Sequence, residues 1–155
     1  MVPENANGGI EYKVVLITGG TSGIGEATAV ALAAMGAEVV VTGRNEERGR
    51  AALAEIRRAS ASEKVSLMLA DLAVQAEVRG LAEGFKERYN RLGVLINDAG
   101  VIQSKRTETP DGIELTLAVN HLAPFLLTNL LLDLLKSSAP SRSSPSPPRP
   151  DVTQR

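Results

Sequence analysis

The feature that most constrains the fold is an apolar run, KVVLIT at residues 13–18, which passes directly into the glycine-rich stretch GGTSGIG at residues 19–25. The run is rich in β-branched residues and predicts a strand, and a helical pattern follows the glycines. Gly36 ends that helix, whose apolar face is expected to hold Ile24, Ala27, Ala31, Leu32 and Met35. A strand, a tight glycine-rich turn and a helix predict the first unit of an α/β fold.

The same alternation of strand and helix continues along the chain. Strands are expected at residues 38–42, 64–70 and 93–97. One helix is expected from Asn45, its N-cap, to residue 59, and a long one over residues 113–136. The helix between them has an apolar face made of Val78, Leu81, Phe85, Tyr89 and Leu92. Because the strands are continuous apolar runs, they predict a parallel sheet that helices cover on both faces.

The composition divides the chain into three segments. At 155 residues it is long enough for one domain with a core of its own. We expect a flexible N-terminus at residues 1–11, a single domain at 12–136 and a disordered tail at 137–155. The tail holds six serines and five of the chain's eight prolines, and such a segment buries too little apolar surface to offset the entropy of ordering.

Charge and residue types argue against several classes of function. A formal net charge of −1 gives no reason to expect a nucleic acid or a charged membrane surface as a partner. The most apolar window, residues 122–135, contains polar side chains and is too short to span a bilayer. There is no cysteine, and no cluster of His, Asp or Glu has the spacing of metal ligands, so we predict no metal site. The lack of cysteine and of a signal peptide favours a cytoplasmic location.

The positions of the glycines in the loop indicate a ligand-binding site. Gly19 permits the tight turn after the strand, Gly23 lets the backbone approach a diphosphate, and Gly25 allows close packing of helix on strand. The N-terminus of the helix offers unpaired N–H groups and the positive end of its dipole to the anion. No Gly-Lys-Ser/Thr occurs in the chain, which argues against NTP hydrolysis at a P-loop. We therefore predict a loop that binds a dinucleotide; the alternative is a tight turn that binds nothing.

Four motifs, taken in order, resemble those of the short-chain dehydrogenase/reductase family. Residues 18–25 match its glycine motif, T-G-x-x-x-G-x-G. The DL pair at residues 71–72 lies where the family has an acidic residue facing the adenine ring, and NDAG at residues 97–100 lies where it has N-N-A-G. Asn120 falls on the long-helix asparagine of the family's catalytic tetrad. The resemblance covers residues 12–142 and is greatest to the branch that contains the retinol dehydrogenases.

This resemblance implies half of a doubly wound Rossmann fold, an α/β architecture with about four parallel strands in the order 3-2-1-4 and helices on both faces. It also implies a nicotinamide dinucleotide as cofactor and one catalytic residue, Asn120. The residues expected to bind the cofactor are Thr18, Gly19, Thr21, Ser22, Gly23, Ile24, Gly25, Arg44, Asp71, Leu72, Asn97, Ala99 and Gly100. Asp98 departs from the family's second asparagine, and because a carboxylate only accepts hydrogen bonds we expect a local loss of stability there and no change of ligand.

The end of the second predicted strand indicates which nicotinamide cofactor is preferred. In dinucleotide folds an acidic residue at this point binds the ribose 2′-hydroxyl of NAD. The sequence here is VTGRN at residues 41–45, which has no acid and places Arg44 where it can pair with a 2′-phosphate. We therefore predict NADP rather than NAD. The alternative is a solvated arginine at the start of a helix.

The residues that would carry the chemistry of the family are missing. That chemistry needs a serine, and a tyrosine followed at the fourth position by a lysine that favours the phenolate. The only tyrosines are Tyr12 and Tyr89, followed at that position by Leu16 and Gly93. The chain is therefore expected to be inactive alone and to use a small carbonyl or alcohol substrate only if the missing half is supplied. His121, the sole histidine, is expected in a packing or surface role.

Two other interpretations remain open. One is a non-catalytic module that binds a dinucleotide or associates with other chains, including copies of itself, through the helix at residues 113–136. The other is a gene-fragment product without a stable role, whose open sheet edge invites self-association. Turnover separates the enzyme from the module, and soluble protein of a single size separates the module from the fragment.

Overall fold

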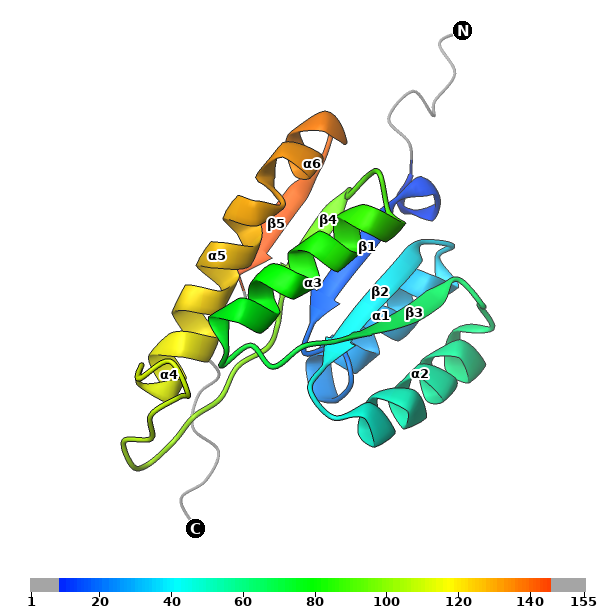
Figure 1. Ribbon diagram of the computed structural model, residues 1–155. Coiled ribbons are helices and arrows are strands. Elements are labelled where there is room, and N and C mark those ends of the chain that lie inside the picture. The colour runs from blue at the N-terminus through cyan, green and yellow to red at the C-terminus, as the bar shows by residue number, and fades with distance from the viewer. Residues whose placement is uncertain (1–8, 146–155) are drawn as a thin grey trace, which may run out of the picture.

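The structure is built around one parallel β-sheet. A computed structural model describes residues 9–145 of the chain. Five strands lie in the order β3-β2-β1-β4-β5 (Figure 1). Their bounds are Val14–Thr18 for β1, Glu38–Gly43 for β2, Val65–Leu69 for β3, Val94–Asn97 for β4 and Arg142–Pro145 for β5. The predicted order 3-2-1-4 is therefore confirmed, and the predicted strand count of four is corrected to five.

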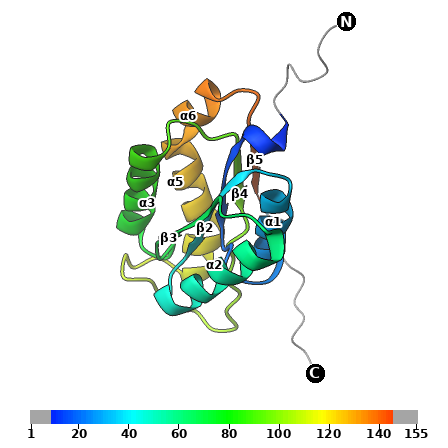
Figure 2. The same cartoon turned by 90° about the vertical axis from the view of Figure 1, so that its right-hand side faces the viewer.

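Helices cover both faces of this sheet. They are the short 3-10 helix η1 (Ile10–Tyr12), α1 (Gly23–Ala34), α2 (Glu46–Ser60), α3 (Gln75–Arg88), α4 (Leu115–Leu117), the π-helical turn η2 (Ala118–Leu122), α5 (Ala123–Leu130) and α6 (Leu132–Ser137). The helices α1 and α2 lie on one side of the sheet, and α3, α5 and α6 lie on the other (Figure 2). The fold is thus the predicted doubly wound α/β architecture.

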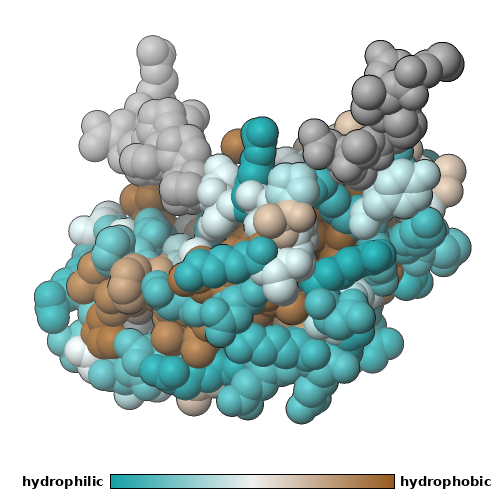
Figure 3. Space-filling model, turned by 90° about the horizontal axis from the view of Figure 1, so that it is seen from above, coloured by the Kyte–Doolittle hydropathy of each residue, from teal (hydrophilic) through white to brown (hydrophobic). Residues whose placement is uncertain are grey.

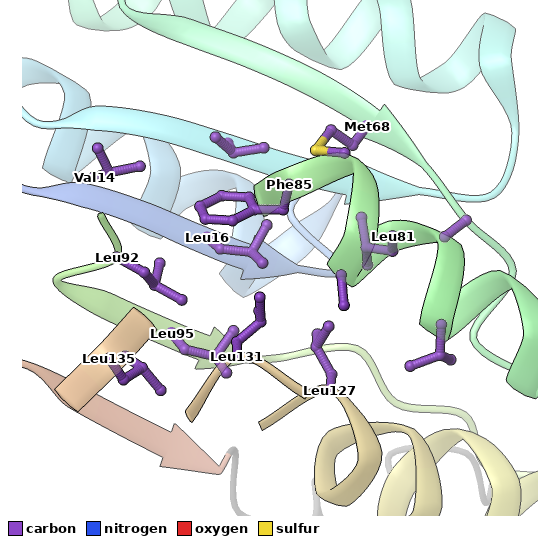
Figure 4. Close-up of a cluster of buried hydrophobic side chains, with 14 of the residues drawn as sticks. Val14, Leu16, Met68, Leu81, Phe85, Leu92, Leu95, Leu127, Leu131 and Leu135 are labelled. Atoms are coloured by element: carbon purple, nitrogen blue, oxygen red, sulfur yellow. The ribbon is translucent and has the colours of Figure 1, made fainter. Parts of the chain in front are cut away.

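The sheet separates two apolar cores. All five residues of β1 are buried, and they alternate between the cores because successive side chains of a strand point to opposite faces. Val15 and Ile17 pack with α1 and α2, whereas Val14 and Leu16 pack with α3, α5 and α6. In the core between the sheet and α3, α5 and α6, Phe85 of α3 lies beside Leu16 (Figure 4). The predicted apolar face of α3 is confirmed for Val78, Leu81 and Phe85, whereas Tyr89 and Leu92 pack on the same core from beyond the end of the helix.

The predicted apolar face of α1 is wrong. The residues that α1 buries against the sheet are Gly25, Ala29 and Ala33, whereas Ile24 and Met35 are 60% and 58% exposed. Small side chains on the inner face let the helix lie close to the strands, so Ile24 and Met35 stay exposed, and of the predicted face Leu32 packs partly against this core. The spacing of apolar residues therefore selected the wrong side of this helix, since Ala27 and Ala31 are exposed as well.

The single long helix expected at residues 113–136 is interrupted. It is divided into α4, the π-helical turn η2, α5 and α6. Pro124 is in the first turn of α5 and has no N–H to donate to the carbonyl of Asn120. A π-helical turn at this point is a common accommodation, often found near functional sites. No helix within residues 9–145 has both the length and the apolar character needed to cross a membrane.

The tail predicted to be disordered from residue 137 is wrong for residues 137–145. The backbone N–H of Arg142 donates to the carbonyl of Gly93 at 2.9 Å, and β5 then pairs in parallel with β4. Ser138 also accepts a hydrogen bond from the Leu92 N–H, at 2.9 Å. Backbone pairing at a sheet edge does not require apolar side chains, so a serine-rich segment can form a strand. The rest of the predicted tail and residues 1–8 of the predicted N-terminus lie outside the described residues.

Candidate functional site

The candidate site is a groove of about 240 Å³ at the edge of the sheet where the strands end. Segments that follow β1, β2, β3 and β4 form it, at the point where the chain crosses from one face of the sheet to the other. In open α/β sheets, ligands bind at this switch point. The lining residues are Gly19, Thr21, Ser22, Thr42, Gly43, Arg44, Asn45, Arg48, Ala70, Asp71, Leu72, Asp98, Ala99, Gly100, Val101 and Val119.

The loop after β1 has the backbone geometry that its glycines predicted. Gly19 and Gly23 have φ values of +68° and +56°, in the left-handed region that favours glycine. A Cβ on Gly19 would lie 2.7 Å from the Cα of Ala99, so the loops after β1 and β4 are in direct backbone contact. Gly25 is buried at the start of α1, where a Cβ would collide with the Gly19 carbonyl oxygen. A larger residue at Gly19 or Gly25 would displace the loop, and one at Gly23 would be strained by the positive φ.

The N-terminus of α1 opens toward the groove. Ser22 is its N-cap residue, yet the Ser22 side chain makes no capping hydrogen bond. The first N–H groups of a helix have no partner within the helix, and together with the helix dipole they attract anions. Ser22 itself lines the groove. This end of the groove is therefore suited to a phosphate group.

Two arginines lie at the β2 side of the groove. Arg44 follows the last residue of β2, and Arg48 lies in the first turn of α2. The N-cap Asn45 accepts a hydrogen bond from the Arg48 backbone N–H at 2.9 Å, as its predicted capping role requires. Both arginines are exposed, and neither side chain makes an ion pair or a hydrogen bond within residues 9–145. Arg48 was missed by the sequence reasoning, although its spacing of four from Arg44 places it one helical turn further along.

The loop after β4 is held by Asn120. The Asn120 Oδ1 accepts from the backbone N–H of Val101, and its Nδ2 donates to the Val101 carbonyl, both at 2.8 Å. The backbone N–H of Ala99 donates to the Thr18 Oγ1 at 3.3 Å. Asn120 thus uses its amide to fix the loop that lines the groove, from its position in the π-helical turn η2.

The loop after β3 is fixed by Asp71. Its carboxylate accepts from the backbone N–H of Ala73 at 2.9 Å, while its own N–H donates to Glu77 at 2.6 Å. Asp71 and Leu72 both line the groove, as expected. Because the carboxylate already bonds its own loop, Asp71 is held in a defined orientation at the groove wall.

The other predicted site residues lie outside the groove lining. Thr18 and Asn97 are 1% and 4% exposed and lie one layer below it. The Asn97 Nδ2 is 3.4 Å from the Thr128 Oγ1, and its Oδ1 is buried without a hydrogen-bond partner in the described part of the chain. Gly23 and Gly25 shape the loop and the start of α1, and Ile24 is exposed. Asn97 therefore lies under the site instead of forming its wall.

The tyrosine and histidine side chains of the described residues lie away from the groove. Tyr12 is exposed in η1, and the Tyr89 hydroxyl is hydrogen-bonded to the Ser66 hydroxyl at 2.8 Å. His121 is exposed and does not line the groove. Among the residues that line the groove there is no tyrosine, lysine or histidine. Within the described ranges, no group of three or more His, Cys, Asp or Glu side chains is arranged to hold a metal ion.

Known proteins resemble this chain over most of its length. The short chain dehydrogenase family matches residues 13–142. Human Dehydrogenase/reductase SDR family member 13 is 44% identical over 140 residues, which cover 90% of this chain and 37% of the relative. Human Retinol dehydrogenase 11 is 44% identical over 130 residues, which cover 84% of this chain and 41% of the relative. The chain therefore spans only about two fifths of the length of these two relatives.

Solved structures share the fold. The Pseudomonas aeruginosa RhlG/NADP complex has a TM-score of 0.70 and 32% identity, covering 83% of this chain and 50% of that one. A short-chain dehydrogenase from Sphingobium yanoikuyae in complex with NADPH has a TM-score of 0.65 and 34% identity, covering 77% and 46%. Sequence motifs, sheet order and relatives agree: the chain belongs to the short-chain dehydrogenase family, in the branch that contains the retinol dehydrogenases.

Proposed function

We propose that this chain binds NADP(H) in the groove and forms the cofactor-binding part of an oxidoreductase that interconverts alcohols and carbonyl compounds. One observation carries the proposal: two features that attract phosphate line the same groove. They are the N-terminus of α1 behind the glycine loop and the guanidinium groups of Arg44 and Arg48. NADP(H) carries both a diphosphate and a 2′-phosphate, which match these two features.

The residues present fit such a cofactor. Because Gly19 has no Cβ, the backbone of the loop can pack against Ala99. The other side of the loop would then be available to a diphosphate. The diphosphate would be held by the loop from Gly19 to Ser22, the adenine by Asp71 and Leu72, and the nicotinamide end by the loop that Asn120 fixes. When bound, NADPH would supply a hydride, and the residues of this chain would hold and orient the cofactor.

The preference for NADP over NAD rests on charge. The segment that ends β2 has no acidic side chain, and the lining acids Asp71 and Asp98 follow β3 and β4 instead. A guanidinium beside a phosphate forms a charge-assisted hydrogen bond that is often bidentate. The two similar structures that contain NADP and NADPH support the same preference.

The chain by itself is proposed to hold the cofactor without transferring a hydride. Its only two tyrosines, Tyr12 and Tyr89, lie away from the groove, and Asn120 is engaged with the backbone of Val101. An amide neither gives nor takes a proton at neutral pH, so Asn120 cannot act as a general acid or base. The retinol dehydrogenases among its relatives suggest an alcohol or aldehyde substrate for an assembly that supplies the missing groups.

A calorimetric titration at low salt tests this proposal. A hydrogen bond to a charged group is worth about 1.5–3 kcal/mol, so NADPH should bind about 10- to 100-fold more tightly than NADH. Equal affinity for the two cofactors would leave the family assignment intact and remove the NADP preference. No binding of either would refute the proposed function of the groove.

A second candidate function, association through the helical segment at residues 113–136, is favoured by its exposed apolar side chains. Phe125 of α5 is 64% exposed and Leu132 of α6 is 37% exposed. Figure 3, seen from above Figure 1, shows hydrophobic surface gathered at the left, on the side where α5 lies. Sedimentation of the chain beside a Phe125→Ser variant tests it. If the wild-type chain and the Phe125→Ser variant both sediment as monomers, association through this helix is rejected.

A further inference from the structure

We infer that Asp98 sets the affinity of the groove for its cofactor, by placing a carboxylate against the helix N-terminus that would receive the diphosphate. This inference rests on the proposed function, since it concerns the same groove. Asp98 lines the groove and is only 6% exposed. Its Oδ2 lies 2.9 Å from the point where a Cβ on Gly25 would stand, and Gly25 is in the first turn of α1.

The backbone explains why this carboxylate reaches α1. Asn97 ends β4, and successive side chains of an extended segment point to opposite faces of a sheet. The Asn97 amide approaches Thr128 of α5 on one face, whereas Asp98 approaches α1 on the other. Gly25 has no side chain, so nothing keeps the carboxylate away from the first turn of the helix.

A carboxylate in this position competes with a bound phosphate. The N-terminus of a helix attracts negative charge, and the effect is confined to the first turn. Asp98 already supplies one negative charge there, in a setting that excludes most water. A diphosphate brought to the same turn is repelled by that charge, because like charges interact strongly where solvent screening is weak.

Asp71, the other acid of the groove, does not compete in this way. It follows β3, and its carboxylate accepts the N–H of Ala73 in its own loop. The N–H groups of α1 follow the loop after β1, a different segment from the loop that the Asp71 carboxylate bonds. Asp98 is therefore the acid of the groove lining that the structure places against α1.

The change from Asp98 to asparagine removes the charge and keeps the shape. An asparagine also retains an oxygen acceptor and gains a donor. Loss of one buried like charge should tighten binding of the diphosphate about tenfold. The gain should be equal for NADPH and NADH because both contain a diphosphate, whereas substitutions at Arg44 alter the ratio between them.

The test compares the wild-type chain with Asp98→Asn and Asp98→Ser, using Asp133→Asn as a matched control. Asp133 is an exposed acid in the first turn of α6 and does not line the groove, so it controls for the change in net charge. Dissociation constants for NADPH and NADH come from the fluorescence of the reduced nicotinamide. Inorganic pyrophosphate is titrated as a competitor to isolate the diphosphate. Circular dichroism checks the fold, and Asp98→Ser decides the question if Asp98→Asn does not fold.

The expected result is a similar gain in affinity for NADPH, NADH and pyrophosphate in the Asp98 variants, with no gain in Asp133→Asn. Unchanged or weaker binding in folded Asp98 variants, beside a wild-type chain that binds NADPH, would overturn this inference alone. A gain for NADPH without one for NADH would also overturn it, because the charge would then act on the 2′-phosphate. Absence of binding by every variant would overturn the proposed function, and the inference with it.

Discussion

Replacing Arg44 by aspartate should reverse the preference of the groove between NADP(H) and NAD(H). Arg44 lies between Gly43, which ends β2, and Asn45, which caps α2, so both neighbours fix its backbone. A carboxylate in its place repels a 2′-phosphate. The same carboxylate can accept a hydrogen bond from the 2′-hydroxyl of NAD(H), as the acid at this position does in NAD-binding folds.

The magnitude follows from the exposure of the guanidinium. A hydrogen bond to a charged group is worth about 1.5–3 kcal/mol, and an exposed side chain should reach only the lower end of that range. Arg44→Ala should therefore weaken NADPH binding about tenfold, since each 1.4 kcal/mol is a factor of ten. Repulsion in Arg44→Asp should bring the total change in the NADPH/NADH ratio to about 100-fold. Arg48→Ala should cost less, about threefold, because its side chain comes from the next turn.

The assay is a titration of each variant with NADPH and with NADH, followed by the fluorescence of the reduced nicotinamide. Arg50→Ala is the matched control, because Arg50 lies on the same helix and pairs with Glu46 at 2.6 Å, away from the groove lining. Raising the salt concentration from about 0.05 M to about 0.5 M should shrink the preference for NADPH, because screening weakens exposed charge pairs. If Arg44→Asp weakens NADPH and NADH equally, Arg44 acts on the fold of the loop and the reasoning from charge is refuted.

Three further outcomes are expected. Gly19→Ala should abolish cofactor binding and lower the melting temperature, because φ is +68° and the new Cβ would lie 2.7 Å from the Cα of Ala99; a variant that binds NADPH normally would contradict this. The 155-residue chain should oxidise NADPH with aldehydes and ketones, retinal included, no faster than background; turnover that falls in Asn120→Ala would show that the active site was misplaced. The pKa of Glu114 is lowered because its carboxylate accepts the backbone N–H groups of Thr116 and then of Leu117. Its stabilisation is therefore present above the ordinary pKa of the carboxyl and lost as the pH falls through the lowered value. Melting curves of wild type and Glu114→Gln should converge on acidification, and a constant difference would reject this role.

Local features of the sequence were sufficient for the main elements. The apolar runs predicted β1, β2, β3 and β4, because strands of a sheet covered by helices on both faces are rich in apolar residues. Every residue of β1 is buried, whereas β3, at the edge of the sheet, is buried only at Val65 and Met68. The glycines of residues 19–25 also predicted the tight turn after β1, since φ values such as +68° at Gly19 favour glycine. Asn45 was identified as a cap for a similar reason: its short polar side chain reaches the N–H three residues later.

Contacts between distant segments were decided only by the tertiary structure. β5 forms because β4 presents an unpaired backbone edge, which the serine and proline content of residues 142–145 does not reveal. The inner face of α1 follows from how closely the helix approaches the sheet, so Gly25 and the alanines are buried and Ile24 is not.

The site shows the same division. The sequence alone determined that a glycine loop, an arginine after β2 and polar residues after β3 and β4 lie in a parallel α/β chain, because each signal is local. Tertiary structure decided that Arg48 joins Arg44, that Asn97 lies beneath the groove, and that the Asp98 carboxylate approaches Gly25. The physical reason is that side-chain direction at the end of a strand depends on which helix covers each face. That arrangement is set by packing between segments far apart in the chain.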